Sequence, residues 1–87
     1  MSEMTPEAHD EVLAAVSHLP HLLVFAYLQQ VHPSHVMHAA GGFRDFTRIG
    51  AADPDMWTSI FRLNRPAGLA ALERLEDALA EARALVV

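Results

Sequence analysis

Hydrophobic residues recur every three or four positions along most of this chain, which is the spacing that predicts α-helices. The first such segment begins at Thr5-Pro6, where threonine can cap a helix and proline suits its first turn. It continues to about Gln30, and its centre, VLAAVSHLPHLLVFAYL, is the most apolar stretch of the chain. We expect Pro20 to kink or break this helix, because it lacks an amide hydrogen and its ring clashes with the carbonyl of Val16.

The middle of the chain is expected to be less regular. Residues 31–40 are interrupted by Pro33 and predict a connection with a helical turn. Gly41 and Gly42 predict a turn, or a place where the backbone closely approaches another group. Residues 43–50 predict a short helix.

Two further helices are expected in the C-terminal half. Asp53-Pro54 begins one by the same combination of cap and proline, and Pro66 begins the other. The last helix has an apolar stripe suited to packing or dimerisation, formed by Leu69, Leu72, Leu75, Leu79, Ala82 and Val86. No segment alternates as a strand does, and no glycine-rich phosphate loop is present. The sequence predicts one all-α domain over residues 1–87.

Composition adds an oligomeric expectation. Of the 87 residues, 52% are hydrophobic, which is more apolar surface than so short a chain can easily bury, so we expect a homodimer. There is no cysteine, which excludes disulfides and thiolate metal sites. The acidic N-terminus is unlike a signal peptide, and residues 12–28 are too short and too polar for a membrane span. A net charge of −5 argues against a nucleic-acid partner.

Charge is unevenly distributed, with a locally basic region between residues 41 and 65. This region has four arginines and three aspartates, a balance of +1, and the chain has no lysine. Arginine binds carboxylates in a bidentate manner, so a small anionic ligand is one interpretation. Ion pairing on helix surfaces is the other, and composition alone favours it.

The apolar first helix carries polar side chains of its own. On an ideal helix Asp10, Ser17 and His21 lie within about 40° of one another, and His18 lies about 60° from His21. Histidine can donate, accept or titrate near neutral pH, which suits an oxygen-rich ligand. The alternative is a buried histidine bonded to a backbone carbonyl, such as the one that Pro20 leaves free.

Metal binding is not expected, although the chain contains six histidines. The spacings are i, i+3, as in His18 and His21, and again in His32, His35 and His38. Helical zinc sites usually pair histidines at i, i+4 with a carboxylate, as in HExxH, and that motif is absent.

The segment GGFRDFTRIGAADPDMW holds the remaining candidates. Arg44 and Arg48 share a helix face and repel unless an acid or a ligand lies between them, and Asp45 is the expected partner for one of them. Thr47 places a hydroxyl beside Arg48. Trp57, the sole tryptophan, is either a core anchor or an aromatic wall of a pocket.

The order HD, SHLPH, GGFRDFTRI, DPDMW and a later asparagine closely resembles the C-terminal helical domain of prephenate dehydrogenases, a family that includes arogenate and cyclohexadienyl dehydrogenases. The resemblance covers about residues 6–65. It implies a small helical domain like the C-terminal domain of 6-phosphogluconate dehydrogenase, arranged as an intertwined homodimer. It also implies NAD(P)-dependent oxidative decarboxylation of prephenate to 4-hydroxyphenylpyruvate, in cytoplasmic tyrosine biosynthesis.

Matched to this family residue by residue, His21 would line the substrate pocket, and Arg48 would bind a carboxylate of prephenate or arogenate. Gly41 would approach the pocket through its backbone. Trp57 would reach the pocket of the other subunit.

Further residues are matched with supporting roles. His9 and Asp10 would lie at the domain interface, where Asp10 would help to order it. The substrate pocket would be completed by a set of neighbouring residues, namely Ser17, Phe43 and Thr47.

The sequence departs from the family pattern in two respects. Gly50 stands where alanine is common, which should slightly loosen a helix end. The Rossmann domain that binds NAD or NADP, and the catalytic histidine it carries, are absent from this chain. We therefore expect a C-terminal fragment, or a separate chain that works with a partner, and no turnover from the chain alone.

Two alternatives remain at this point. One is a non-catalytic helical dimerisation or interaction module built on the same scaffold. The other is a helical chorismate mutase, in which SHLPH and GGFRDFTRI would have no place. The sequence leaves open prephenate versus arogenate, NAD versus NADP, and feedback inhibition by tyrosine.

Overall fold

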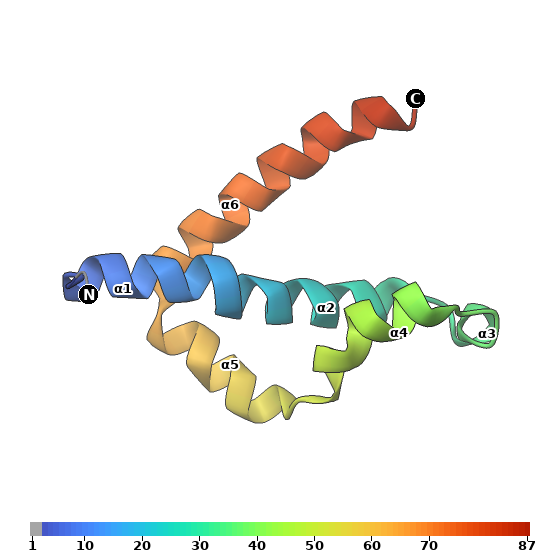
Figure 1. The fold of residues 1–87 in the computed structure, drawn as a ribbon, viewed down its shortest axis with the longest axis horizontal. Coiled ribbons are helices and arrows are strands. Elements are labelled where there is room, and N and C mark those ends of the chain that lie inside the picture. Colours follow the sequence, from blue (N-terminus) through green and yellow to red (C-terminus); the bar gives the residue numbers. More distant parts are fainter. Residues whose placement is uncertain (1–2) are drawn as a thin grey trace.

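A computed structural model describes residues 3–87, and all regular structure in this range is helical (Figure 1). The first two residues of the expected domain lie outside the described range. In chain order the elements are α1 (Pro6–Leu13), a π-helical turn (Ala14–His18), α2 (Leu19–Gln30), α3 (Pro33–Val36), α4 (Gly41–Thr47), a 3-10 turn (Arg48–Ala51), α5 (Pro54–Leu63), α6 (Arg65–Ala82) and a final 3-10 turn (Arg83–Leu85). The all-α prediction is confirmed.

The helix starts follow the local signals of the sequence. Thr5 Oγ1 accepts a hydrogen bond from the amide of Ala8 at 3.1 Å, and proline occupies the first turn of α1. Asp53 Oδ1 accepts from the amide of Asp55 at 3.0 Å at the start of α5. Each cap satisfies a donor that the first helical turn cannot pair internally.

Of the two outcomes expected at Pro20, a kink or a break, the break does not occur. The chain runs from Pro6 to Gln30 as one continuous helix of 25 residues. The amide of Leu19 reaches back five residues to the carbonyl of Ala14, and this wider turn lies directly before the proline. A π turn inserts one residue into the helix, so the positions before and after it are out of phase with an ideal α-helix. The alignment calculated above for Asp10 and His21 therefore does not apply.

The backbone structure at Gly41 and Gly42 also differs from the prediction. They form the first turn of α4 without positive φ, and an added Cβ at either would meet no atom within 4 Å. The close approach lies instead at Gly50, where an added Cβ would overlap the end of Leu28 and lie 3.1 Å from Val24 Cγ1. The 3-10 turn therefore rests on α2 through a glycine.

The interior of the described chain is small. Only Ala14, Val24 and Ala71 are buried among residues 3–87. Large hydrophobic side chains remain exposed on several helices, and Leu63 at the end of α5 is 88% exposed. The helix Pro6–Gln30 is long and apolar enough to span a membrane, but core helices of soluble proteins can have the same length and composition.

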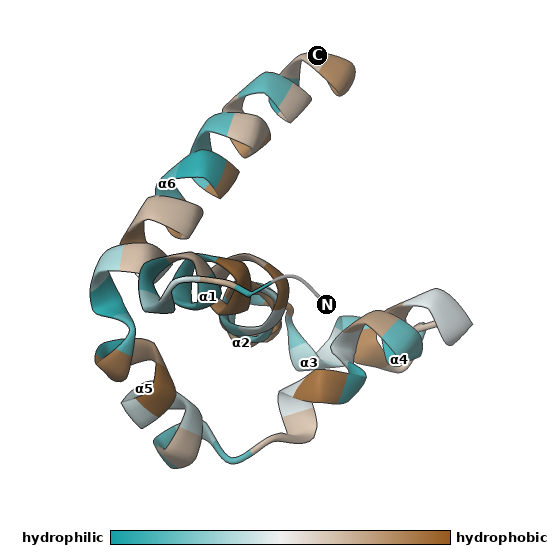
Figure 2. Ribbon diagram, turned by 60° about the vertical axis from the view of Figure 1, so that its left-hand side comes forward, coloured by the Kyte–Doolittle hydropathy of each residue, from teal (hydrophilic) through white to brown (hydrophobic). Residues whose placement is uncertain are grey.

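The shape of the single chain is open. Figure 1 shows α4 and α5 on one side of the first long helix, while the C-terminal half of α6 points away from it. In Figure 2, hydrophobic segments are visible on α5 and at intervals along α6. The accessible surface is 6929 Å², against about 5,100 Å² for a compact protein of this mass. The radius of gyration is 15.1 Å, against about 12 Å expected for a compact domain of this length.

Candidate functional site

The centre of the candidate site is His21 on α2. Its Nδ1 lies 2.9 Å from the carbonyl oxygen of Ser17, one helical turn earlier. A carbonyl oxygen only accepts, so Nδ1 carries the hydrogen and donates it. The alternative raised by the sequence, a histidine hydrogen-bonded to a backbone carbonyl, is therefore present, but the carbonyl is that of Ser17 rather than the one that Pro20 leaves free. No hydrogen bond to His21 Nε2 is formed within residues 3–87.

Trp57 on α5 covers one face of this imidazole. The two ring centroids are 3.5 Å apart and the planes are inclined by 12°, a stacked arrangement. Trp57 also meets Phe61 at 5.8 Å, and Phe61 meets Phe25 of α2 at 6.3 Å. Trp57 is half-buried in this aromatic cluster, which joins α5 to α2. Its expected reach into the pocket of another subunit stays a prediction.

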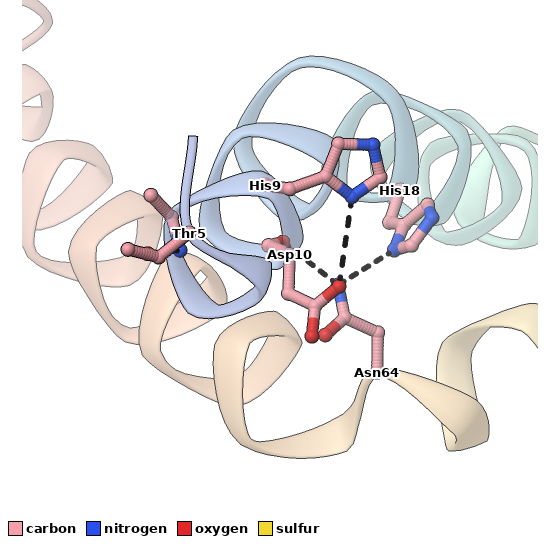
Figure 3. Close-up of polar contacts among 6 residues, drawn as sticks. Thr5, His9, Asp10, His18 and Asn64 are labelled. Atoms are coloured by element: carbon pink, nitrogen blue, oxygen red, sulfur yellow. Dashed lines mark hydrogen bonds and ion pairs between the residues drawn. The ribbon is translucent and has the colours of Figure 1, made fainter. Parts of the chain in front are cut away.

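His18 and Asn64 form a polar contact beside the aromatic cluster (Figure 3). Asn64 Nδ2 lies 3.3 Å from His18 Nδ1 and 2.8 Å from the carbonyl oxygen of Asp10. The His18 ring meets Trp57 edge-on, with centroids 6.2 Å apart. The motif order of the family included this asparagine, but no contact was predicted for it, because its partners Asp10 and His18 lie 54 and 46 residues away.

Arg48 lies at the start of the 3-10 turn after α4. Its side chain is exposed and forms no ion pair within residues 3–87. The pairing expected for Asp45 is likewise not formed there. No hydrogen bond or ion pair joins Arg48 to His21. Among the described residues 3–87 the guanidinium therefore has no ion-pair partner, and it is not bonded to the stacked imidazole.

Thr47 and Phe43, which were also matched to the substrate pocket, contact other residues of this chain. The hydroxyl of Thr47 donates to the carbonyl oxygen of Phe43 at 2.7 Å, so it is used within α4. The ring of Phe43 lies 6.1 Å from that of Tyr27 on α2. Gly41 is exposed. Phe43 thus contacts α2, whereas the Thr47 hydroxyl is bonded within α4.

His9 and Asp10 lie on the exposed surface of α1. His9 Nδ1 is 3.8 Å from Asp10 Oδ1, and the side chains are 60% and 58% exposed (Figure 3). Both side chains are thus more than half exposed, and their expected place at an interface stays a prediction.

A cavity of about 180 Å³ lies between α2, α5 and α6. Its wall is mostly apolar, with two arginines and one histidine among its lining residues, which include His18, Leu22, Phe61, Arg62, Arg65 and Leu72. His21, Arg48 and Trp57 do not line it. This cavity is therefore not the pocket that the sequence predicts around His21 and Arg48.

Residues 3–87 contain neither a cluster of metal ligands nor a dinucleotide-binding unit. No group of three or more histidine, aspartate or glutamate side chains that could hold a metal occurs in residues 3–87. The same residues contain no strand followed by a glycine loop and a helix, the unit that holds the pyrophosphate of a dinucleotide. These residues do not fit NAD(P) by themselves.

Comparison with known proteins decides the family. The family model described as "Prephenate dehydrogenase, dimerization domain" matches residues 5–87. The chain belongs to the prephenate dehydrogenase family. The resemblance read from the motifs HD, SHLPH and GGFRDFTRI is thereby confirmed.

Curated members of the prephenate dehydrogenase family are similar over most of the chain. Identity to a prephenate dehydrogenase of Bacillus subtilis is 42% over 69 residues, covering 72% of this chain and 19% of that protein. Identity to a cyclohexadienyl dehydrogenase of Zymomonas mobilis is 38% over 77 residues, covering 80% and 26%. The chain thus spans between a fifth and about a quarter of the length of these relatives.

Solved structures of the prephenate dehydrogenase family share the fold. The A. aeolicus prephenate dehydrogenase, in complex with hydroxyphenyl propionate and NAD+, superimposes with a TM-score of 0.81 at 38% identity, covering 98% of this chain and 32% of that one. The Synechocystis arogenate dehydrogenase gives a TM-score of 0.85 at 28% identity, covering 95% and 33%. The small helical domain predicted from the motifs is confirmed.

Proposed function

We propose that this prephenate dehydrogenase domain forms a homodimer and supplies part of the substrate pocket of a cytoplasmic enzyme that oxidises prephenate or arogenate with NAD(P)+. The observation that carries the proposal is the imidazole of His21. Its Nδ1 is hydrogen-bonded to the carbonyl oxygen of Ser17, and one face of the ring is covered by Trp57. Its Nε2 has no hydrogen-bond partner within residues 3–87. A ring held in this way has a fixed orientation toward a ligand.

Arg48 would supply the charge that the substrate requires. Prephenate carries carboxylates, and a guanidinium binds a carboxylate through two parallel hydrogen bonds. Arg48 is exposed and unpaired within residues 3–87, so no intramolecular ion pair has to be broken first. A charge-assisted hydrogen bond contributes about 1.5–3 kcal/mol, which corresponds to roughly a 10-fold to 100-fold change in affinity.

The redox step needs groups beyond the described residues. NAD(P)+ supplies a hydride acceptor, and the helices described above do not fit a dinucleotide. In the proposed enzyme a Rossmann domain holds the nucleotide and carries the catalytic histidine. The residues of this chain bind and orient the substrate, and we expect no turnover from the chain alone.

The open shape supports the homodimer. The chain exposes about 1,800 Å² more surface than a compact protein of its mass, and exposed apolar side chains occur on α1, α4, α5 and α6. Covering this excess on both copies would bury about 3,600 Å², which lies in the range of obligate dimers.

Reconstitution tests this function. The chain is assayed with prephenate and NAD+ alone, and again with a nucleotide-binding domain of the family added. We expect turnover only in the mixture. Robust turnover by the chain alone would refute the division of labour. A stable dimer that neither binds hydroxyphenyl propionate nor supports turnover would favour the non-catalytic module.

Arg48→Ala tests the carboxylate contact. In the reconstituted enzyme it should weaken the binding of hydroxyphenyl propionate roughly 10-fold to 100-fold without changing the helical circular dichroism. Arg83→Ala, an exposed arginine at the far end of α6, is the matched control and should leave binding unchanged. If Arg48→Ala unfolds the domain, the arginine has a structural role instead.

A further inference from the structure

Asn64 connects parts of the chain that are remote in sequence. Within residues 3–87, the side-chain hydrogen bonds that span more than four positions both come from its amide, to the carbonyl of Asp10 and to the imidazole of His18 (Figure 3). These partners lie 54 and 46 residues away. Asn64 therefore ties the junction of α5 and α6 to the first long helix.

The side chain of Asn64 is not used for the local role that its position suggests. Asn64 is the N-cap residue of α6, and asparagine is among the best N-cap residues. Its side chain nevertheless makes no capping hydrogen bond, and its backbone has φ −115° and ψ 39°. A cap is worth about 1 kcal/mol to a helix. The amide points to the first helix instead.

The chemistry of the partners fixes where the protons lie. The carbonyl oxygen of Asp10 only accepts, so the Asn64 atom 2.8 Å from it is the amide nitrogen. The same nitrogen lies 3.3 Å from His18 Nδ1 and offers its second hydrogen there. His18 Nδ1 is then the acceptor, and the neutral ring carries its hydrogen on Nε2. His21 is the opposite case, because its Nδ1–H donates to Ser17.

We propose that Asn64 is a positioning residue that holds His18 in the Nε2–H tautomer, so that the two imidazoles in contact with Trp57 differ: His18 offers a donor, Nε2–H, and His21 offers an acceptor, Nε2. This inference rests on the proposed function and deepens it. A donor and an acceptor together suit a ligand that carries both a carboxylate and a hydroxyl group. Neither Nε2 forms a hydrogen bond within residues 3–87.

The π turn makes this contact possible. On an ideal helix, positions eight residues apart differ by about 80° in direction, so Asp10 and His18 would face different ways. The additional residue in the π turn changes that phase, and both groups reach Asn64 Nδ2. Trp57 lies on the helix that ends at Asn64, and its ring is stacked on His21 and edge-on to His18. One helix, α5, thus fixes both imidazoles.

Asn64→Asp tests the tautomer directly. Aspartate caps helices as well as asparagine does, but its carboxylate can only accept. It offers no hydrogen to the carbonyl oxygen of Asp10 or to His18 Nδ1, so a neutral His18 that bonds to it must carry its hydrogen on Nδ1. The measurement is the 15N NMR spectrum of the histidine rings at about pH 8.5, where an ordinary imidazole is neutral. We expect the wild-type chain to show His18 as Nε2–H and His21 as Nδ1–H, and Asn64→Asp to invert His18 alone.

Gln30→Glu is the matched control, because the Gln30 amide donates only to the carbonyl of Tyr27 within its own helix. It should leave both histidine spectra unchanged. Wild-type His18 found as Nδ1–H would overturn the proposal without any variant, so the test holds even if Asn64→Asp fails to fold. An unchanged His18 spectrum in a folded Asn64→Asp would overturn it as well.

A binding measurement separates this inference from the proposed function. In the reconstituted enzyme, Asn64→Asp should weaken the binding of hydroxyphenyl propionate about 10-fold, as for the loss of one hydrogen bond, while Gln30→Glu should not. If the wild-type enzyme does not bind the analogue, the proposed function fails while the tautomer result stands. If it binds and Asn64→Asp binds equally well, Asn64 has no positioning role.

Discussion

Dilution should dissociate and destabilise this domain, because a single chain buries too little of its apolar surface. The single chain exposes 6929 Å², about 1,800 Å² more than a compact protein of its mass. With a mass of 9.6 kDa per chain, the dimer mass is twice that, about 19 kDa. The unfolding temperature of such a dimer rises with protein concentration, because dissociation and unfolding are coupled.

Sedimentation velocity and thermal unfolding over a hundredfold range of concentration check this prediction. We expect a species of about 19 kDa that dissociates only on strong dilution, and an unfolding midpoint that falls as the chain is diluted. A 9.6 kDa species at micromolar concentration, with a radius of gyration near 15.1 Å and a midpoint independent of concentration, would refute the reasoning.

A substitution on α6 locates the contact. Leu79 is 55% exposed and belongs to the apolar stripe of that helix, so Leu79→Glu should be tolerated by the single chain. It should weaken dimerisation by 10-fold or more, since it would place a charge in an apolar contact. Glu81→Gln, two residues later, is the control. Equal dissociation constants for the two variants would exclude this part of α6 from the contact.

Three further outcomes follow from the packing. Ala71→Leu should destabilise the fold by about 1–3 kcal/mol in thermal unfolding, because Ala71 is 2% exposed and a larger side chain would not fit. Ala78→Leu, on the exposed face, should not destabilise it, and equal unfolding midpoints for the two variants would contradict the burial of Ala71. Thr5→Ala should cost about 1 kcal/mol through loss of the α1 cap, and an exposed control, Thr58→Ala, much less. Trp57→Ala should shift the His21 ring resonances in NMR, since the stacked ring no longer shields them, and unchanged resonances would show that the stack is not formed in solution.

The helices could be predicted because their signals are local. Thr5 and Asp53 cap their own helices, and prolines one residue later fix the first turns. Such contacts span two or three positions and depend on little else. The hydrogen bond between His21 and Ser17 is also local, because it spans four positions, although the carbonyl suggested by the sequence was a different one.

The remainder depends on contacts between distant segments. The periodicity of residues 6–30 contains no mark of the π turn, whose extra residue changes which side chains share a face. The stack of Trp57 on His21 joins positions 36 residues apart, and Asn64 reaches across 54. Residue types restrict what such side chains can do, but only the docking of α5 decides which partners they meet.

The π turn also makes the first helix tolerant of one particular change in length. Removing one residue other than His18 from the AAVSH segment would restore a regular α-helix without disturbing any cap. Because the π turn inserts a single residue, the residues on either side of the deletion would keep their directions relative to one another. Such a shortened chain would keep both imidazoles on the face that meets α5, whereas removing one residue from α1 would rotate them by about 100° relative to the residues before it.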